Sequence, residues 1–166
     1  MSNCFTQACA AALLAFSMMA GSAQVAQAEG MKPAASASGV IATKSAYGMD
    51  ETVMRLKKDV AAKGIAFFQE IDQAALAAKA GIPLKPSVLL IFGNPPLGTQ
   101  FITANPQAGL DWPVRMLVYR DDAGAVWVAY TDFGWIAHRH GVTTRDQQFH
   151  MASEVAASIA SSVSAR

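Results

Sequence analysis

The chain has 166 residues, of which 52% are hydrophobic and only 15% are charged, and its formal net charge is +1. This length suffices for one domain with a hydrophobic core, but it is short for two. Because no basic block occurs anywhere in the sequence, we expect neither non-specific binding to nucleic acid nor a polybasic membrane tether.

The first 28 residues carry no charged side chain. Their apolar stretch, residues 8–20, spans 13 residues and is too short to cross a bilayer, which takes about 20. Small residues follow in the pattern that signal peptidase cleaves. We interpret residues 1–28 as a secretory signal peptide, cleaved after Ala28 or alternatively after Ala23. The other interpretation is a disordered or anchoring tail, but no lipoprotein-like box precedes either cysteine, and we expect no stable membrane anchor.

Both cysteines, Cys4 and Cys9, fall within this leader. The mature chain would therefore have no disulfide, no thiolate metal site and no cysteine nucleophile. We expect a periplasmic or secreted protein whose stability comes from its hydrophobic core.

A flexible lead-in is predicted at residues 29–38, and strand and helix patterns alternate after it. In the first half of the domain, the sequence pattern predicts strand 39–45, helix 50–64, strand 65–71, helix 72–81 and strand 87–92. Asp50 and Asp72 are the expected N-caps of the two helices. The run at 87–92 is apolar throughout, which is typical of a central strand buried on both faces.

The second half of the domain contains the clearest hairpin. It predicts a short helix after Asn94, strands 114–120 and 125–130 with a tight turn between them, a helix within 131–141 and a helix at 147–162. Residues 39–166 therefore predict a single compact α+β domain, with a sheet of about five strands and helices packed on it.

Two glycines after the third strand, Gly93 and Gly98, have the spacing of a phosphate-binding loop. Two prolines between them lack the N–H donors that such a loop needs, and Thr99 occupies its lysine position. We therefore predict a helix start capped by Asn94 rather than a nucleotide site. The N-terminus of this helix could still hold a carboxylate or another anion.

Three histidines, His138, His140 and His150, are weak candidates for metal ligands, with Asp132 or Asp146 as an acidic partner. On a helix His138 and His140 would point apart, whereas on an extended segment they would share a face. Alternatively, His140 lies at a helix C-terminus, where a cation is favourable. We predict no bound metal or other cofactor.

Other catalytic patterns are weaker still. Glu70 and Asp72 lie two residues apart on a strand and could form an acid–base pair, although a helix cap is the commoner role for Asp72. No G-x-S-x-G nucleophile motif occurs. The aromatic residues within 130–135, with Trp112 and Trp127, could line an apolar pocket, belong to the core or form a dimer surface.

The segments LLIFGNPPLGTQF and LDWPVRMLVYRDDAGAVWVAYTDFGWIAHRHG together resemble the domain-of-unknown-function 302 family over about residues 38–142. Members commonly show F-G-N-P-x-x-G-T, L-x-x-P before a strand, an acidic-glycine hairpin, a W-V-x-Y strand and a closing histidine-glycine. The positions that match are Asn94, Pro95, Gly98, Thr99, Pro113, Tyr130 and His140. The resemblance implies a compact, dimeric α+β fold and no agreed activity, cofactor or catalytic residue.

The sequence thus predicts an exported protein that binds a small ligand or a protein partner, forms a homodimer and shows no evident catalysis. We expect its binding surface at one end of the sheet, formed by Asn94, Gly98, Thr99, Tyr130, Asp132 and His140. One alternative is a metal-dependent or acid/base hydrolase that uses the region of His138, His140 and Asp132. The other is a structural dimer module of an envelope assembly.

Overall fold

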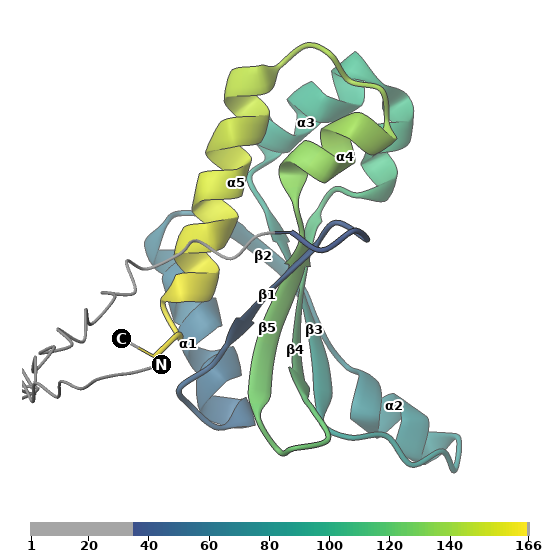
Figure 1. Cartoon of the computed structure of the whole chain (residues 1–166), viewed down its shortest axis with the longest axis vertical. Helices are drawn as coiled ribbons and strands as arrows, with labels where there is room; N and C mark the ends of the chain where they lie inside the picture. Colours follow the sequence, from purple (N-terminus) through teal and green to yellow (C-terminus); the bar gives the residue numbers. More distant parts are fainter. Residues whose placement is uncertain (1–34, 166) are drawn as a thin grey trace, which may run out of the picture. The chain divides into compact units, whose positions relative to one another are not determined.

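The computed structural model describes residues 35–165 (Figure 1). The predicted signal peptide, residues 1–28, and most of the predicted lead-in lie outside the described residues. The first strand begins at Val40, one residue after the predicted start of that strand.

Five strands form one antiparallel sheet in the order β1-β5-β4-β3-β2. The strands are β1 (Val40–Lys44), β2 (Ala66–Asp72), β3 (Ser87–Gly93), β4 (Val114–Arg120) and β5 (Val126–Thr131). β4 and β5 form the hairpin that the sequence predicts, with Met116 opposite Tyr130.

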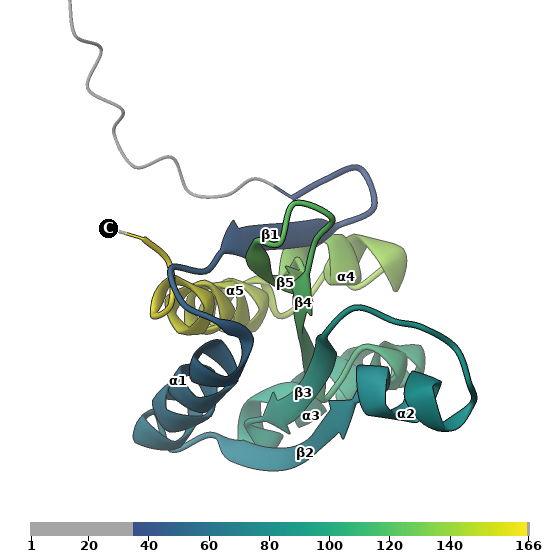
Figure 2. The same cartoon turned by 90° about the horizontal axis from the view of Figure 1, so that it is seen from below.

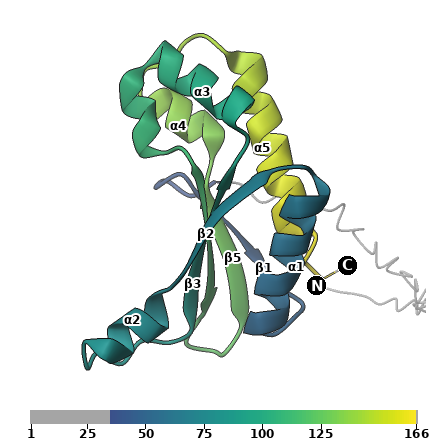
Figure 3. The same cartoon turned by 180° about the vertical axis from the view of Figure 1, so that it is seen from behind.

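The helices occupy three positions around this sheet (Figures 1 and 3). α1 (Met49–Ala62) and α5 (Asp146–Ser161) lie along one face. α3 (Pro95–Ala104), the 3-10 helix η1 (Pro106–Leu110) and α4 (Phe133–Arg139) gather at one end of the strands. The short α2 (Gln73–Lys79) lies near the other end, on the side away from α1 and α5 (Figure 2). The predicted α+β fold class is confirmed.

The hydrophobic core lies between the sheet and the two long helices. Successive strand residues point to opposite faces, so alternate residues such as Leu90 and Met116 are fully buried. Leu56 and Val60 on α1 supply the other side of this core, and Ile159 on α5 completes it. The apolar stripes predicted for both helices thus face the sheet.

The structure corrects the predicted start of α1. The N-cap is Gly48 and not Asp50, because the Thr52 N–H already donates to the Gly48 carbonyl. Asp50 lies in the first turn, where its charge favours the helix dipole without capping an N–H. The other predicted caps are confirmed: Asp72, Asn94 and Asp132 each accept a hydrogen bond from the backbone N–H three residues on.

The structure also corrects the prediction that the third strand is buried on both faces. Leu90 and Phe92 of β3 are buried under the helices, but Leu89 and Ile91 on the opposite face are only partly buried. Within residues 35–165, no helix covers the middle of that second face (Figure 2). In the part of the chain that the structure describes, helices therefore cover this apolar strand on one face and not on the other.

Candidate functional site

The six residues expected to form one binding surface lie in separate surroundings. Asn94 and Gly98 border an apolar hollow beside α3. Tyr130 is buried on the helix-covered face of β5. His140 is buried elsewhere, against the carboxylate of Asp111.

The remaining two predicted residues each stabilise a helix. Thr99 lies within α3, and Asp132 directly precedes α4. The Thr99 hydroxyl donates to the Pro95 carbonyl at 2.8 Å, one turn earlier in α3. The Asp132 carboxylate accepts from the Trp135 N–H at 2.8 Å and caps α4. Pro95 is the first residue of α3, which confirms the predicted helix start after the glycine-asparagine-proline turn.

The hollow beside α3 is small and apolar. Its volume is about 40 Å³, and its lining is apolar, with Phe101, Trp112 and Phe133 among the residues that form it. Gly98 is packed directly against Trp112, and a Cβ atom added at Gly98 would lie 1.7 Å from the indole Nε1. The second glycine of the motif therefore makes room for a tryptophan and not for a phosphate.

The phenol of Tyr130 belongs to the core. Burial, with a smaller contribution from the Asp132 carboxylate, raises the pKa of Tyr130 to about 12. A free tyrosine has a pKa of about 10. Folding therefore favours the neutral phenol.

We expect Tyr130 to ionise in the folded protein about two pH units above an exposed tyrosine. The unfolded chain loses this proton first, so the stability that Tyr130 contributes is complete below about pH 10 and is lost as the pH rises toward 12. Ultraviolet absorbance of a Tyr47→Phe/Tyr119→Phe variant isolates this phenol. The same variant in denaturant is the control and should ionise near pH 10; an identical midpoint in the folded state would contradict the prediction.

The three histidines occupy different positions. His138 lies in the last turn of α4, and His140 is its C-cap residue, as predicted. His150 is exposed on α5, 3.6 Å from the Glu154 carboxylate. Among residues 35–165, no group of three or more His, Cys, Asp or Glu side chains is arranged to hold a metal ion. Asp132 caps α4 while His140 contacts Asp111, so the alternative site around His138, His140 and Asp132 gains no support from these contacts.

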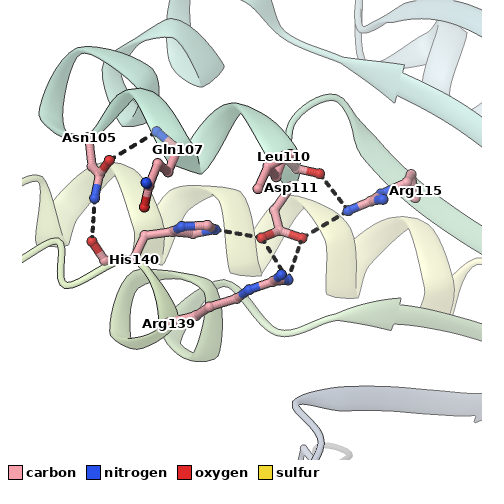
Figure 4. A network of polar contacts seen from close by, with 7 residues as sticks. All are labelled: Asn105, Gln107, Leu110, Asp111, Arg115, Arg139 and His140. Carbon is pink, nitrogen blue, oxygen red and sulfur yellow. Dashed lines mark hydrogen bonds and ion pairs between the residues drawn. The ribbon is translucent and has the colours of Figure 1, made fainter.

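The most developed polar arrangement surrounds Asp111, which sequence analysis missed (Figure 4). This carboxylate is buried between η1 and β4. Its Oδ2 atom lies 2.6 Å from the His140 Nε2 atom and 3.1 Å from the Arg139 Nη1 atom. Its Oδ1 atom accepts from Arg115 Nη2 at 2.8 Å and from Arg139 Nη1 at 3.3 Å. We call these four residues the Asp111 cluster.

The fold assembles the Asp111 cluster from distant parts of the chain. Asp111 and His140 are 29 residues apart. The side-chain amide of Asn105 donates to the His140 carbonyl at 2.7 Å and ties the end of α4 to the start of η1. The available sequence signal was the position of Asp111 between Leu110 and Trp112, because a charged residue among apolar ones needs a partner when it is buried.

One antiparallel sheet, two long helices along one face and shorter helices near both ends of the strands define this molecule as a compact α+β domain. The chain belongs to the DUF302 family, a domain of unknown function, whose model matches residues 41–165. The family resemblance recognised in the sequence is confirmed. In residues 35–165, no helix combines the length and the apolar composition that a membrane crossing requires.

A solved DUF302 protein from Bacillus stearothermophilus has the same fold. Its TM-score is 0.69 with 16% sequence identity, and the match covers 75% of this chain and 98% of the other. Among curated proteins, fluoride-specific ion channel FluC 1 of Brucella suis is 36% identical over 105 residues, which are 63% of this chain and 41% of the relative. FluC 2 of Brucella melitensis is also 36% identical over 105 residues, which are 39% of that protein. The chain thus matches about two fifths of the length of these relatives.

Proposed function

We propose that the chain is an exported interaction module that forms a homodimer through the second face of its sheet. One observation carries this proposal: a partly buried apolar surface crosses four neighbouring strands without a covering helix in residues 35–165. We call it the sheet patch, and it comprises Ile71, Leu89, Ile91, Leu117 and Trp127.

The register of the sheet makes this patch continuous. Leu89 pairs with Ile71 on one side and with Leu117 on the other. Leu117 is therefore central. A second sheet packed face to face at about 10 Å would give these side chains the burial that the apolar β3 sequence predicts.

Helix α2 and the loop that follows it, together called the α2 segment (residues 73–84), add apolar surface on the same side of the sheet (Figure 2). Leu76, Ile82 and Leu84 are all exposed there, and no residue of α2 is buried. Exposed apolar groups grouped in this way are typical of protein–protein contacts. A second copy would supply the same patch and the same α2 segment to the contact, and the family resemblance also implies a dimer.

Export is supported by the uncharged apolar leader and by the position of both cysteines within it.

The Brucella relatives support the role of an interaction module. In them the matching region makes up about two fifths of a longer chain that is named an ion channel. A domain that is joined to a further segment in these relatives suits a binding role beside a partner.

Native mass spectrometry of the protein produced with its leader and taken from the periplasm tests both parts of the proposal. We expect a protomer that lacks residues 1–28, or 1–23, and an assembly of two protomers. Leu117→Arg places a charge at the centre of the patch and should weaken the dimer by at least about 30-fold, equivalent to roughly 2 kcal/mol.

Met54→Arg is the matched control, because Met54 is exposed on α1, which lies on the opposite face. This variant should remain dimeric. A monomeric wild-type protein would reject the dimer, and a protomer that retains residues 1–28 would reject export. The two results are independent of each other.

A further inference from the structure

The Asp111 cluster holds more positive than negative charge. Within residues 35–165, Asp111 is the only carboxylate that pairs with Arg115 or Arg139. A guanidinium group is a cation at neutral pH. One carboxylate therefore faces two cations, and the His140 ring occupies a further position on the same carboxylate.

Half of each guanidinium group remains available for another acceptor. Arg115 uses only its Nη2 atom, which donates to Asp111 and to the Leu110 carbonyl. Arg139 uses only its Nη1 atom. In the described part of the chain the other nitrogen atoms of both groups have no acceptor, and both side chains are nearly half exposed. These N–H donors therefore face solvent.

The buried carboxylate contacts both guanidinium groups, which approach it from two different directions (Figure 4). Arg115 Nη2 and Arg139 Nη1 both contact Asp111 Oδ1, so the distance between them cannot exceed the sum of 2.8 and 3.3 Å. Arg139 is also stacked over the Trp135 ring at 5.5 Å. Two arginines fixed in this way lose less conformational freedom on binding than two free ones.

A hydroxyl lies beside Arg115, one of the two arginines. Thr131 follows Tyr130, and Arg115 precedes Met116, the strand partner of Tyr130, so Arg115 and Thr131 are neighbours on adjacent strands. Both residues line a small hollow together with Asp111. The Thr131 hydroxyl makes no hydrogen bond to another residue of the range 35–165 and can donate to a ligand.

We propose that Arg115, Arg139 and Thr131 form a binding site for a small oxyanion, either a carboxylate or a phosphate group. An arginine presents parallel N–H donors that match two oxygen atoms of a carboxylate or phosphate group. A monatomic anion such as chloride cannot accept both hydrogen bonds in this geometry. Asp111 is a positioning residue in this site, since it holds both guanidinium groups while its own oxygens are occupied by them and by His140. All of these contacts lie within one chain.

Titration of the ¹⁵N-labelled chain with sodium phosphate and, separately, sodium acetate tests this proposal by NMR, with sodium chloride keeping the ionic strength constant. We expect saturable shifts of the Arg115 and Arg139 Nε–H signals and of the Thr131 amide. The anion that saturates at lower concentration identifies the ligand as a phosphate or a carboxylate. Arg139→Gln should weaken binding about tenfold.

Arg120→Gln is the control, because Arg120 lies at the other end of β4 and forms no ion pair with a described residue. This variant should bind as the wild type does. Thr131→Val should weaken binding without loss of the fold, since valine suits a strand. Shifts that do not saturate with either anion, or that persist unchanged in Arg139→Gln, would overturn the proposal.

Discussion

Replacement of Asp111 by alanine is expected to lower the free energy of unfolding by about 3 kcal/mol, because it removes one partner of a buried charged cluster. The substitution leaves two guanidinium groups close together without the carboxylate that holds them, and it leaves the buried His140 ring without its partner. Urea denaturation followed by circular dichroism measures the change.

Asp122→Ala is the control for this experiment. Asp122 is fully exposed and pairs only with Lys85 among the described residues, so its loss should leave the free energy of unfolding almost unchanged. A second variant separates charge from packing. This variant combines Asp111→Ala with Arg139→Gln. Because Arg139→Gln then removes a repulsive cation, it should lower the free energy of unfolding no further. A loss below about 1 kcal/mol for Asp111→Ala would show that the cluster contributes little to folding.

The sequence predicted the features that depend on near neighbours. A helix cap needs only a side chain and an N–H three residues later, and Asp72, Asn94 and Asp132 all act in this way. The burial of Phe149 and Ile159 on α5 followed from a helical period, because a single face of that helix is apolar. The number of strands followed from similar local patterns.

The Asp111 cluster could not be predicted because its partners come from separate elements. Nothing near Asp111 in the sequence indicates His140 or Arg139, and the prediction instead placed His140 near Asn94 and Asp132. The prediction that both faces of β3 are buried was wrong for a different reason. Leu89 and Ile91 have the same sequence pattern whether a helix of this chain or another molecule covers them, so the pattern predicts burial but not its source.

A second large effect is expected at Gly98. Helix propensity alone predicts that alanine at a helical glycine stabilises a protein by up to about 1 kcal/mol. Here we expect the opposite sign, a loss of about 2 kcal/mol, because the new Cβ would lie 1.7 Å from Trp112 Nε1 and either α3 or the indole must move. The measurement is the unfolding free energy of Gly98→Ala in urea.

Two comparisons make this result specific to the contact with Trp112. Gly109→Ala is the matched control, because a Cβ there would only touch Ile102 at an ordinary 3.8 Å, and its effect should be small. In a Trp112→Ala background the clash disappears, so Gly98→Ala should become neutral or stabilising, and the two substitutions should couple strongly. A stabilising Gly98→Ala in the wild-type background would mean that the indole does not lie against α3. The glycine would then need another explanation, and the anion-binding interpretation of this helix N-terminus would become worth testing.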